Sequence, residues 1–286
     1  RLAGNPLAHP PQPVPVPFNL PAGFEPDLRA AKGEAAEREY AAMNEPASLD
    51  IRVNLLKTDR EGARAALAEE NVFVEPTPLS PTGLRARGRP SLVAGAACLR
   101  GLVENPDEGS QNAPLLADAR PGLRVLDYCA GAGGKTLAMA AAMANKGAIV
   151  ACDVSLPRLE RAVARVRRAG IHNVSQRVLD AAARKWLKRA AGTFDRVLVD
   201  APCSGTGTWR RNPDARWTLQ PTDIEELVPK QAAILEAAAA LVRPGGKLVY
   251  GLEAENDEGW RLPEAQLAIS GIQVARAVYD TLTAPN

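Results

Sequence analysis

Apolar and polar positions follow two rhythms from Arg124 onward: short apolar runs, and longer segments in which apolar residues recur every three or four positions. The short runs are typical of buried strands and the longer segments of helices. Strands are therefore predicted at 124–128, 148–152, 174–178, 194–199 and 247–250, and helices at 136–145, 155–170, 182–190 and 222–242. Such alternation indicates a mainly parallel sheet covered by helices on both faces. We assign residues 121–286 to an α/β domain.

The preceding segment, residues 30–120, has a shorter and more mixed pattern. Residues 49–56 alternate between apolar and polar side chains, which predicts a strand, and residues 72–74 predict a second one. Between them, Asp59 can cap a helix that extends to about Glu70. We expect a small α+β domain here.

Prolines are concentrated at the start of the chain, where residues 1–26 hold eight of the 24. Proline fixes φ and lacks a backbone donor, so an extended or polyproline II-like conformation is expected. We interpret residues 1–29 as a proline-rich arm on the surface. A ligand for a proline-recognition domain is the alternative, although no clear repeat is present.

Composition narrows the protein class. The 286 residues, 46% hydrophobic and 24% charged, suit one or two globular domains. No apolar run approaches the ~18 residues of a membrane helix. The four widely spaced cysteines indicate reduced thiols and a cytoplasmic protein, and two histidines argue against a histidine-rich metal site. The chain begins with Arg1 and not Met, so we expect it to be a fragment or to lack some residues.

Charge is almost balanced, because 35 basic minus 33 acidic residues leaves +2. A polyanion such as RNA would therefore have to be bound by local basic patches. Solvated surface is the alternative interpretation of most of these patches. Candidate residues are Arg85, Arg87, Arg89, Arg158, Arg161, Arg165, Arg167, Arg168, Lys185, Lys188, Arg189, Arg210, Arg211 and Arg216, with Trp209 and Trp217 as residues that could stack on a base or belong to the core.

Acidic residues stand at or near the ends of four predicted strands: Asp127, Asp153, Asp180 and Asp200. In open parallel sheets, ligands bind beyond the carboxyl ends of the strands. One such acid is ordinary, but four at one edge predict a shared site.

The first of these strands enters the glycine-rich turn Cys129–Thr136, which reads Cys-Ala-Gly-Ala-Gly-Gly-Lys-Thr. A Walker A loop requires glycine where Cys129 stands. A dinucleotide fingerprint finds Thr136 at its third glycine position, although Asp153 is spaced as a ribose-binding acid. S-adenosylmethionine is the third interpretation, because it has no phosphate and needs only close approach to the backbone. A ribose-bearing cofactor is therefore expected.

The segment after the fourth strand distinguishes these interpretations. Asp200 and Cys203 lie three residues apart at the edge of the sheet. This pairing suits methylation at cytosine C5, a poor nucleophile that becomes electron-rich when a thiolate adds at C6. A carboxylic acid near N3 relieves the developing charge. The alternative for Cys203 is a buried structural cysteine.

Three motifs resemble those of the Fmu/Sun family of RNA cytosine-C5 methyltransferases. They are Asp-Ala-Pro-Cys-Ser-Gly-Thr-Gly at 200–207, Arg-Arg-Asn-Pro-Asp at 210–214 and Asp-Tyr-Cys-Ala-Gly-Ala-Gly-Gly-Lys-Thr at 127–136. The similarity covers roughly residues 49–256. Shorter matches are Arg52-Val53-Asn54 and Asp107-Glu108-Gly109-Ser110-Gln111.

The resemblance implies a Rossmann-like class I methyltransferase domain behind a small RRM-like domain. It implies a structured RNA substrate, most often ribosomal, with no metal, and we expect a monomer. Asp200 would polarise the base, Cys203 would assist elimination or add to C6, and Lys135 would help to position the reactants. The implied S-adenosylmethionine-binding residues are Cys129, Ala130, Gly131, Ala132, Gly133, Gly134, Lys135, Asp153, Arg158, Asp180 and Asp200.

The sequence departs from the family after the fifth strand. The family nucleophile is usually a second cysteine in a Thr-Cys pair, but residues 248–256 read Leu-Val-Tyr-Gly-Leu-Glu-Ala-Glu-Asn. The family's C-terminal His-x-x-Asp-Gly-Phe-Phe segment is also absent. Residues could be missing after Gly251, or Cys203 could itself be the nucleophile. Alternatively, the protein binds cofactor and RNA in ribosome assembly without methylating.

Overall fold

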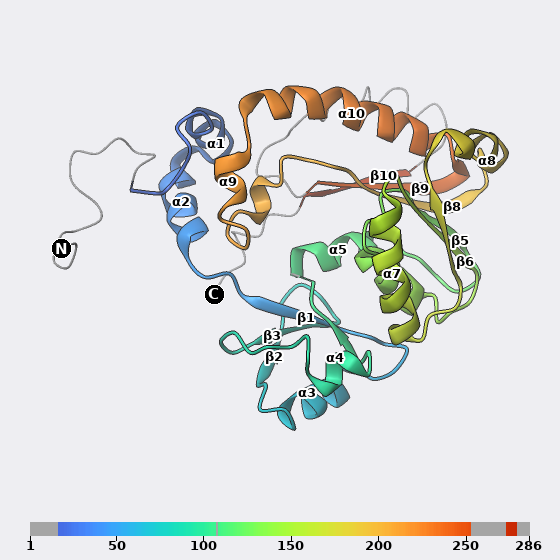
Figure 1. The fold of residues 1–286 in the computed structure, drawn as a ribbon, viewed down its shortest axis with the longest axis horizontal. Coiled ribbons are helices and arrows are strands. Elements are labelled where there is room, and N and C mark those ends of the chain that lie inside the picture. The colour runs from blue at the N-terminus through green and yellow to red at the C-terminus, as the bar shows by residue number, and fades with distance from the viewer. Residues whose placement is uncertain (1–16, 107, 253–272, 279–286) are drawn as a thin grey trace.

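Two β-sheets organise the chain in the computed structural model, which describes residues 17–106, 108–252 and 273–278 (Figure 1). The N-terminal sheet is formed by β1 Leu49–Val53, β2 Val74–Pro76, β3 Gly83–Ala86 and β4 Val103–Glu104. The second is formed by β5 Arg124–Asp127, β6 Ala148–Asp153, β7 Val174–Val178, β8 Phe194–Asp200, β9 Val242–Leu252 and β10 Gln273–Val278.

Helices surround both sheets. They are α1 Glu25–Lys32, α2 Ala36–Asn44, α3 Arg60–Ala68, α4 Ala96–Leu99, α5 Glu108–Ala117, α6 Gly134–Ala142, α7 Leu156–Ala169, α8 Arg184–Ala190, α9 Ala215–Thr218 and α10 Pro221–Ala239. Short 3-10 turns occur at Gly33–Ala35, Ala181–Ala183 and Thr206–Thr208. Pro229 lies inside α10 without ending the helix.

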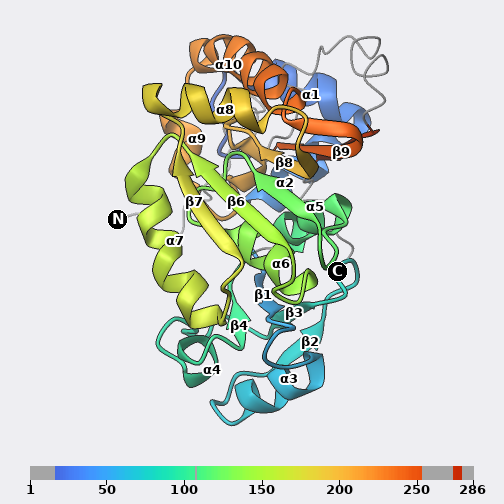
Figure 2. The same ribbon diagram turned by 90° about the vertical axis from the view of Figure 1, so that its right-hand side faces the viewer.

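The large sheet is parallel, with strand order β10-β9-β8-β5-β6-β7. This is the order of a Rossmann-like fold, in which the chain reverses direction across the sheet between its first and fourth strands, here β5 and β8. The two faces bury alternate residues of β8: Val197 and Val199 pack with α8 and α10, whereas Leu198 packs with α5, α6 and α7. Figure 2 shows helices on both sides of this sheet. The predicted α/β domain is confirmed.

The small sheet is antiparallel, with order β2-β3-β1-β4. Its core includes Ile51 and Leu84, which meet the buried side of α3 at Leu67. Asp59 caps α3 as predicted, since its carboxylate accepts a hydrogen bond from the Gly62 backbone N–H at 2.7 Å. The predicted α+β arrangement of this region is confirmed.

Helices α1 and α2 correct the expectation of an extended arm over its last residues. Residues 25–29 are helical, with proline in the first turn, where its missing N–H removes no helical hydrogen bond. Leu20, Phe24 and Leu28 are buried around Trp209 from the large domain, and this packing stabilises the helix. Residues 1–16 of the predicted arm lie outside the described residues.

The last long strand also differs from its prediction. β9 begins at Val242 and not at residue 247, and its pairing with β8 shifts register between Phe194 and Arg196. The irregularity accommodates the Pro-Gly-Gly turn that the sequence places before the strand. Gly251 pairs with Asp200, so β9 continues beside the edge where the acidic residues gather.

Candidate functional site

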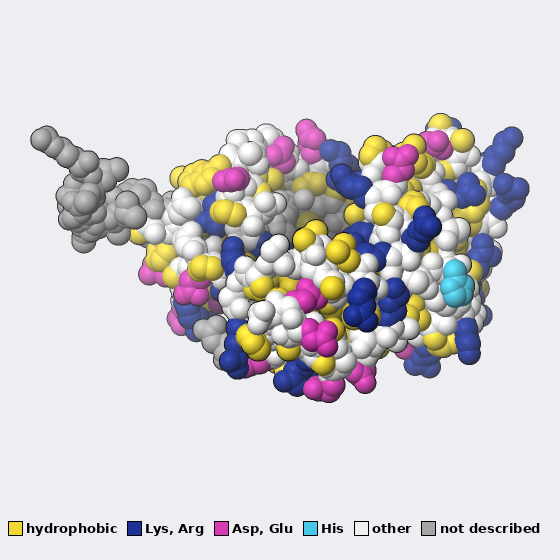
Figure 3. Space-filling model, turned by 60° about the horizontal axis from the view of Figure 1, so that its bottom comes forward, with side chains coloured by type: hydrophobic (Ala, Val, Ile, Leu, Met, Phe, Trp, Pro, Cys, Tyr) yellow, Lys and Arg dark blue, Asp and Glu magenta, His cyan; other side chains and the backbone are white. Residues whose placement is uncertain are grey.

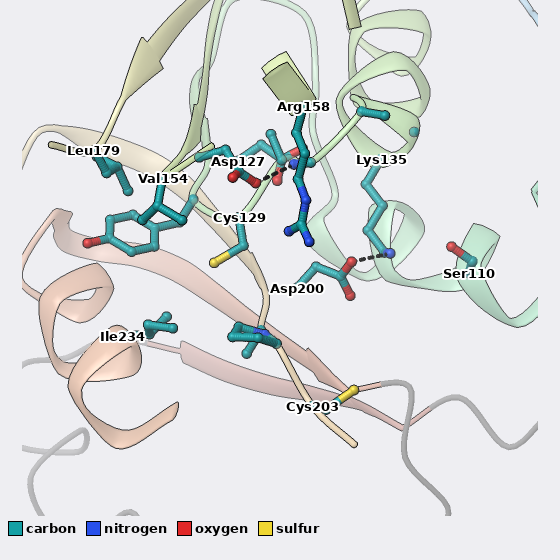
Figure 4. A pocket seen from close by; sticks show the side chains of 18 of the residues that line it. Ser110, Asp127, Cys129, Lys135, Val154, Arg158, Leu179, Asp200, Cys203 and Ile234 are labelled. Carbon is teal, nitrogen blue, oxygen red and sulfur yellow. Dashed lines mark hydrogen bonds and ion pairs between the residues drawn. The ribbon is translucent and has the colours of Figure 1, made fainter. Parts of the chain in front are cut away.

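The carboxyl edge of the large sheet opens into a cavity of about 640 Å³ (Figure 4). It lies beyond the carboxyl ends of the neighbouring strands β5 and β8, where the strand order reverses, which is the place at which open α/β sheets bind ligands. All four predicted strand-end acids line it. The lining is Ser110, Asp127, Tyr128, Cys129, Ala130, Gly131, Ala132, Gly134, Lys135, Asp153, Val154, Arg158, Leu179, Asp180, Leu187, Asp200, Ala201, Pro202, Cys203 and Ile234.

Of the residues predicted to bind the cofactor, Gly133 is absent from this lining. It precedes α6 with φ of +80°, and a Cβ there would lie 2.9 Å from the Cβ of Ala162 on α7. Gly131 also has positive φ, at +53°, but a Cβ there would meet nothing within 4 Å. Gly133 therefore allows the loop to approach α7, while its neighbours face the cavity.

Asp153 stabilises the shape of this loop. Its carboxylate accepts hydrogen bonds from the backbone N–H groups of Gly131 at 2.9 Å and Ser155 at 2.8 Å. Asp180 accepts from the Ala183 N–H at 3.1 Å and caps the turn after β7. Because a carboxylate oxygen has two acceptor positions, both residues can still accept bonds from ligand hydroxyl or amino groups.

Asp127 is fully buried under the loop. One of its carboxylate oxygens accepts a hydrogen bond from the Thr136 hydroxyl at 2.6 Å. Burial, helped by the nearby carboxylates of Asp200 and Asp153, raises the pKa of Asp127 to about 7 against the opposing effects of Thr136 and Lys135. This carboxyl group can therefore carry a proton near neutral pH.

Lys135 and Asp200 form the polar centre of the cavity. The Lys135 ammonium lies 2.5 Å from a carboxylate oxygen of Asp200, and Figure 4 shows this pair between the Arg158 and Ser110 side chains. The lysine side chain is mostly buried. A charge-assisted hydrogen bond of this length holds the Asp200 carboxylate in one orientation.

Two cysteines line the cavity, one from the segment after β5 and one from the segment after β8. Burial raises the pKa of the Cys129 thiol, and the carboxylates of Asp127, Asp153 and Asp200 raise it further. Cys129 is therefore unsuited to act as a thiolate. Cys203 is partly exposed and follows Asp200 on the segment that leaves β8 (Figure 4). Cys203 is the better placed thiol.

Several side chains that were candidates for RNA contact are instead buried or bonded to other groups of the protein. Trp209 is fully buried among α1 and α2, so of its two interpretations the core is correct and base stacking is not, whereas Trp217 is 53% exposed. Arg216 is buried and donates to the carbonyls of Asn19, Met43 and Trp209 and to the side chain of Asn44. Other candidate patch residues also bind groups of the protein. Four form ion pairs: Arg85 with Asp50, Arg87 with Glu75, and both Arg165 and Arg168 with Glu104. Two donate to backbone carbonyls: Arg89 to that of Ala47, and Arg210 to those of Glu45 and Pro46.

The apolar part of the cavity was missed from the sequence. It comprises Val154, Leu179, Leu187 and Ile234, which come from four separate elements or loops. Figure 4 shows Val154, Leu179 and Ile234 on the side of the cavity opposite Lys135. Val154 directly follows the predicted ribose-binding acid Asp153, and this position is the sequence signal that could have identified it; in the structure its side chain is 75% exposed.

Comparison with known proteins identifies this arrangement. Residues 114–258 match the family model described as 16S rRNA methyltransferase RsmB/F. The chain belongs to this family. Residues 24–91 match a second model, the ferredoxin-like domain of RsmF/B-like methyltransferases. The resemblance to the Fmu/Sun family and the Rossmann-like fold behind a small α+β domain are thereby confirmed.

Individual relatives agree with this assignment. The probable ribosomal RNA small subunit methyltransferase B of Synechocystis sp. is 36% identical over 73% of this chain and 47% of its own length. The ribosomal RNA small subunit methyltransferase F of Cronobacter sakazakii is 33% identical over 84% of this chain and 51% of its own. The solved structure of PH0851 has a TM-score of 0.83 and 32% identity, covering 88% of this chain and 58% of that chain. The chain thus spans about half the length of the curated relatives.

Within residues 17–106, 108–252 and 273–278, no helix combines the length and apolar character needed to cross a membrane. The same residues contain no group of three or more His, Cys, Asp or Glu side chains arranged to hold a metal ion.

Proposed function

We propose that this chain transfers a methyl group from S-adenosylmethionine to C5 of a cytosine in RNA, with small-subunit ribosomal RNA as the substrate. The observation that carries the proposal is the placement of Asp200 and Cys203 on one segment beside the cavity of the glycine-rich loop. The names of the relatives support ribosomal RNA as the substrate. A monomeric protein remains a prediction.

The cavity fits the proposed cofactor. Its volume of about 640 Å³ is in the usual range for a ligand of this size. Val154, Leu179, Leu187 and Ile234 offer an apolar surface for a base, and Asp153 and Asp180 offer acceptors for ribose hydroxyls and an amine. Bound there, S-adenosylmethionine would supply an electrophilic methyl group.

The chain's own residues would then prepare the cytosine. The Cys203 thiol would lose its proton to solvent and add to C6 as the thiolate. Asp200, taking up a proton when the base binds, would act as a carboxylic acid and hold that proton at N3, so that C5 becomes nucleophilic. Lys135 would orient the Asp200 carboxylate through their 2.5 Å contact. After transfer, solvent water acting as a base would take the C5 proton, and the electrons of the C5–H bond would re-form the C5=C6 double bond. The C6–S bond would break in the same step and release the methylated base and the Cys203 thiolate.

Basic side chains on the surface are consistent with an RNA substrate. Figure 3 shows a hollow on one face of the molecule, with Lys and Arg side chains along its rim beside acidic and hydrophobic ones. Such groups bind phosphates without reading sequence, and a cytosine inside a helix would have to be flipped out to reach the cavity.

The test is transfer of a radiolabelled methyl group to 16S rRNA, together with a denaturing gel for a covalent protein–RNA adduct. Asp200→Asn is expected to abolish transfer. Cys203→Ala is expected to abolish both transfer and adduct, while Cys98→Ala, in the small domain, leaves both intact. An adduct that accumulates in Cys203→Ala would assign release, and not addition, to this thiol.

The absence of the Thr-Cys pair from residues 248–256 favours a second candidate function, in which the chain binds RNA without methyltransferase activity. Salt-dependent RNA binding with no transfer by the unaltered chain would support it. Methylation of small metabolites but not RNA would exclude both functions.

A further inference from the structure

Helix α7 supports the glycine-rich loop from behind. The loop meets α7 at Gly133, whose Cβ position is 2.9 Å from the Cβ of Ala162. Three residues further along α7, the Nη1 of Arg165 donates a hydrogen bond to the carbonyl oxygen of Ala132 at 2.8 Å. Ala132 lies between two glycines with positive φ, so its backbone has unusual freedom without this contact.

A carboxylate from the other domain holds Arg165 in place. One oxygen of Glu104 accepts from the Nε and Nη2 of Arg165 at 3.1 and 2.7 Å, and its second oxygen accepts from the Nη2 of Arg168 at 2.8 Å. Glu104 is only 6% exposed. Although burial raises the pKa of Glu104, the two guanidinium groups outweigh this effect and lower it below its usual value. The carboxylate is therefore charged, and both of its oxygens accept hydrogen bonds.

Glu104 belongs to the small sheet, where it pairs with Arg52 of β1. Burial lowers the pKa of Arg52 to about 10, and the charge of Glu104 opposes this effect. Figures 1 and 2 both show the lower end of α7 above α4, and Figure 2 shows β4 beside it. A continuous set of contacts thus runs from the small sheet through Glu104 and Arg165 to the backbone of the glycine-rich loop.

We propose that Arg165 is a positioning residue for the cofactor loop and that Glu104 of the small domain sets its orientation, so that the small domain contributes to affinity for the methyl donor. This inference rests on the proposed function. A loop already held in its binding conformation loses less conformational entropy when the ligand binds. Loss of either side chain would therefore lower the affinity for the methyl donor, although neither side chain contacts the donor itself.

The experiment measures the dissociation constant of S-adenosylhomocysteine by calorimetry. Arg165→Met and Glu104→Gln are each expected to weaken binding about tenfold, the effect of one lost charge-assisted hydrogen bond. Lys57→Met is the matched control. The Lys57 ammonium joins the same domains, by donating to the carbonyls of Arg100 and Arg168 at 2.6 Å, but does not reach the loop. The affinity of Lys57→Met for S-adenosylhomocysteine is expected to stay within about twofold of wild type.

A double variant separates positioning from a general loss of stability. If Glu104 acts through Arg165, the double variant Arg165→Met/Glu104→Gln binds no more weakly than Arg165→Met alone. Arg165→Lys keeps a positive charge and a hydrogen-bond donor, so its affinity for S-adenosylhomocysteine is expected to lie between those of Arg165→Met and wild type. This comparison does not require Glu104→Gln to fold.

Three results would overturn the inference: wild-type affinity in Arg165→Met, an equal loss in Lys57→Met, or additive losses in the double variant. If the unaltered chain binds no S-adenosylhomocysteine, the proposed function itself fails, which is a distinguishable outcome.

Discussion

The buried carboxyl group of Asp127 makes stability depend on pH in a direction opposite to that of most carboxylates. Its folded-state pKa is about 7, against an ordinary value of 3.8, and burial is the main cause. The folded state therefore retains a proton that the unfolded chain releases. This contribution to stability is present at low pH and is lost as the pH rises through about 7.

The size of the effect follows from the linkage relation. Each pH unit below the folded pKa adds about 1.4 kcal/mol until the unfolded value is approached. Between pH 8 and pH 5.5 the Asp127 carboxyl should therefore add about 2 kcal/mol to the free energy of unfolding. Asp127→Asn keeps an acceptor for the Thr136 hydroxyl but cannot titrate, so it lacks this contribution.

Urea denaturation of cofactor-free protein, followed by tryptophan fluorescence, measures this difference. The stability of Asp127→Asn relative to wild type should improve by about 2 kcal/mol from pH 5.5 to pH 8. Asp59→Asn, which exchanges one exposed helix-capping side chain for another, is the control and should show no such change. A relative stability of Asp127→Asn that stays constant within about 0.5 kcal/mol would refute the reasoning.

Three further predictions concern the loop, the core and the site. Gly133→Ala should lower the melting temperature and the affinity for S-adenosylhomocysteine more than Gly131→Ala does. Both glycines have positive φ, but only a Cβ at position 133 would also meet α7. Thermal melts and calorimetry measure the two quantities, and equal effects of the two variants would contradict this reasoning. Trp209→Ala should cost about 3–5 kcal/mol in urea denaturation, whereas the exposed Trp217→Ala should cost no more than about 0.5 kcal/mol. Lys135→Met should lower kcat for RNA methylation about tenfold or more, and unchanged single-turnover rates would exclude its orienting role.

The large sheet and the polar half of its cavity could be predicted from the sequence alone. Parallel strands joined by right-handed crossovers must end at the same edge, so Asp127, Asp153 and Asp200 had to converge once the strands were recognised. Asp59 was recognised as a cap because capping depends only on residues within one turn.

The apolar half of the cavity could not be predicted in the same way. Leu187 lies on α8 and Ile234 on α10, and each resembles any other apolar residue of a helix that covers a sheet. Whether such a side chain enters the core or faces a cavity depends on how far the helix extends beyond the strand ends. Hydrophobic periodicity contains no information on that distance.

The basic residues show a different kind of failure, because their partners are distant in the sequence. Arg216 donates to the carbonyl of Asn19, 197 positions away, and Arg165 pairs with Glu104 across 61 positions. Counting arginines treats each one as available to phosphate, whereas these guanidinium groups already bind carbonyl and carboxylate oxygens inside the protein. Breaking such a buried contact to reach RNA would leave its partner unsatisfied. The proposed RNA substrate would therefore meet fewer basic side chains than the composition suggests, and we expect the dependence of RNA affinity on salt, measured by binding at several salt concentrations, to be correspondingly shallow.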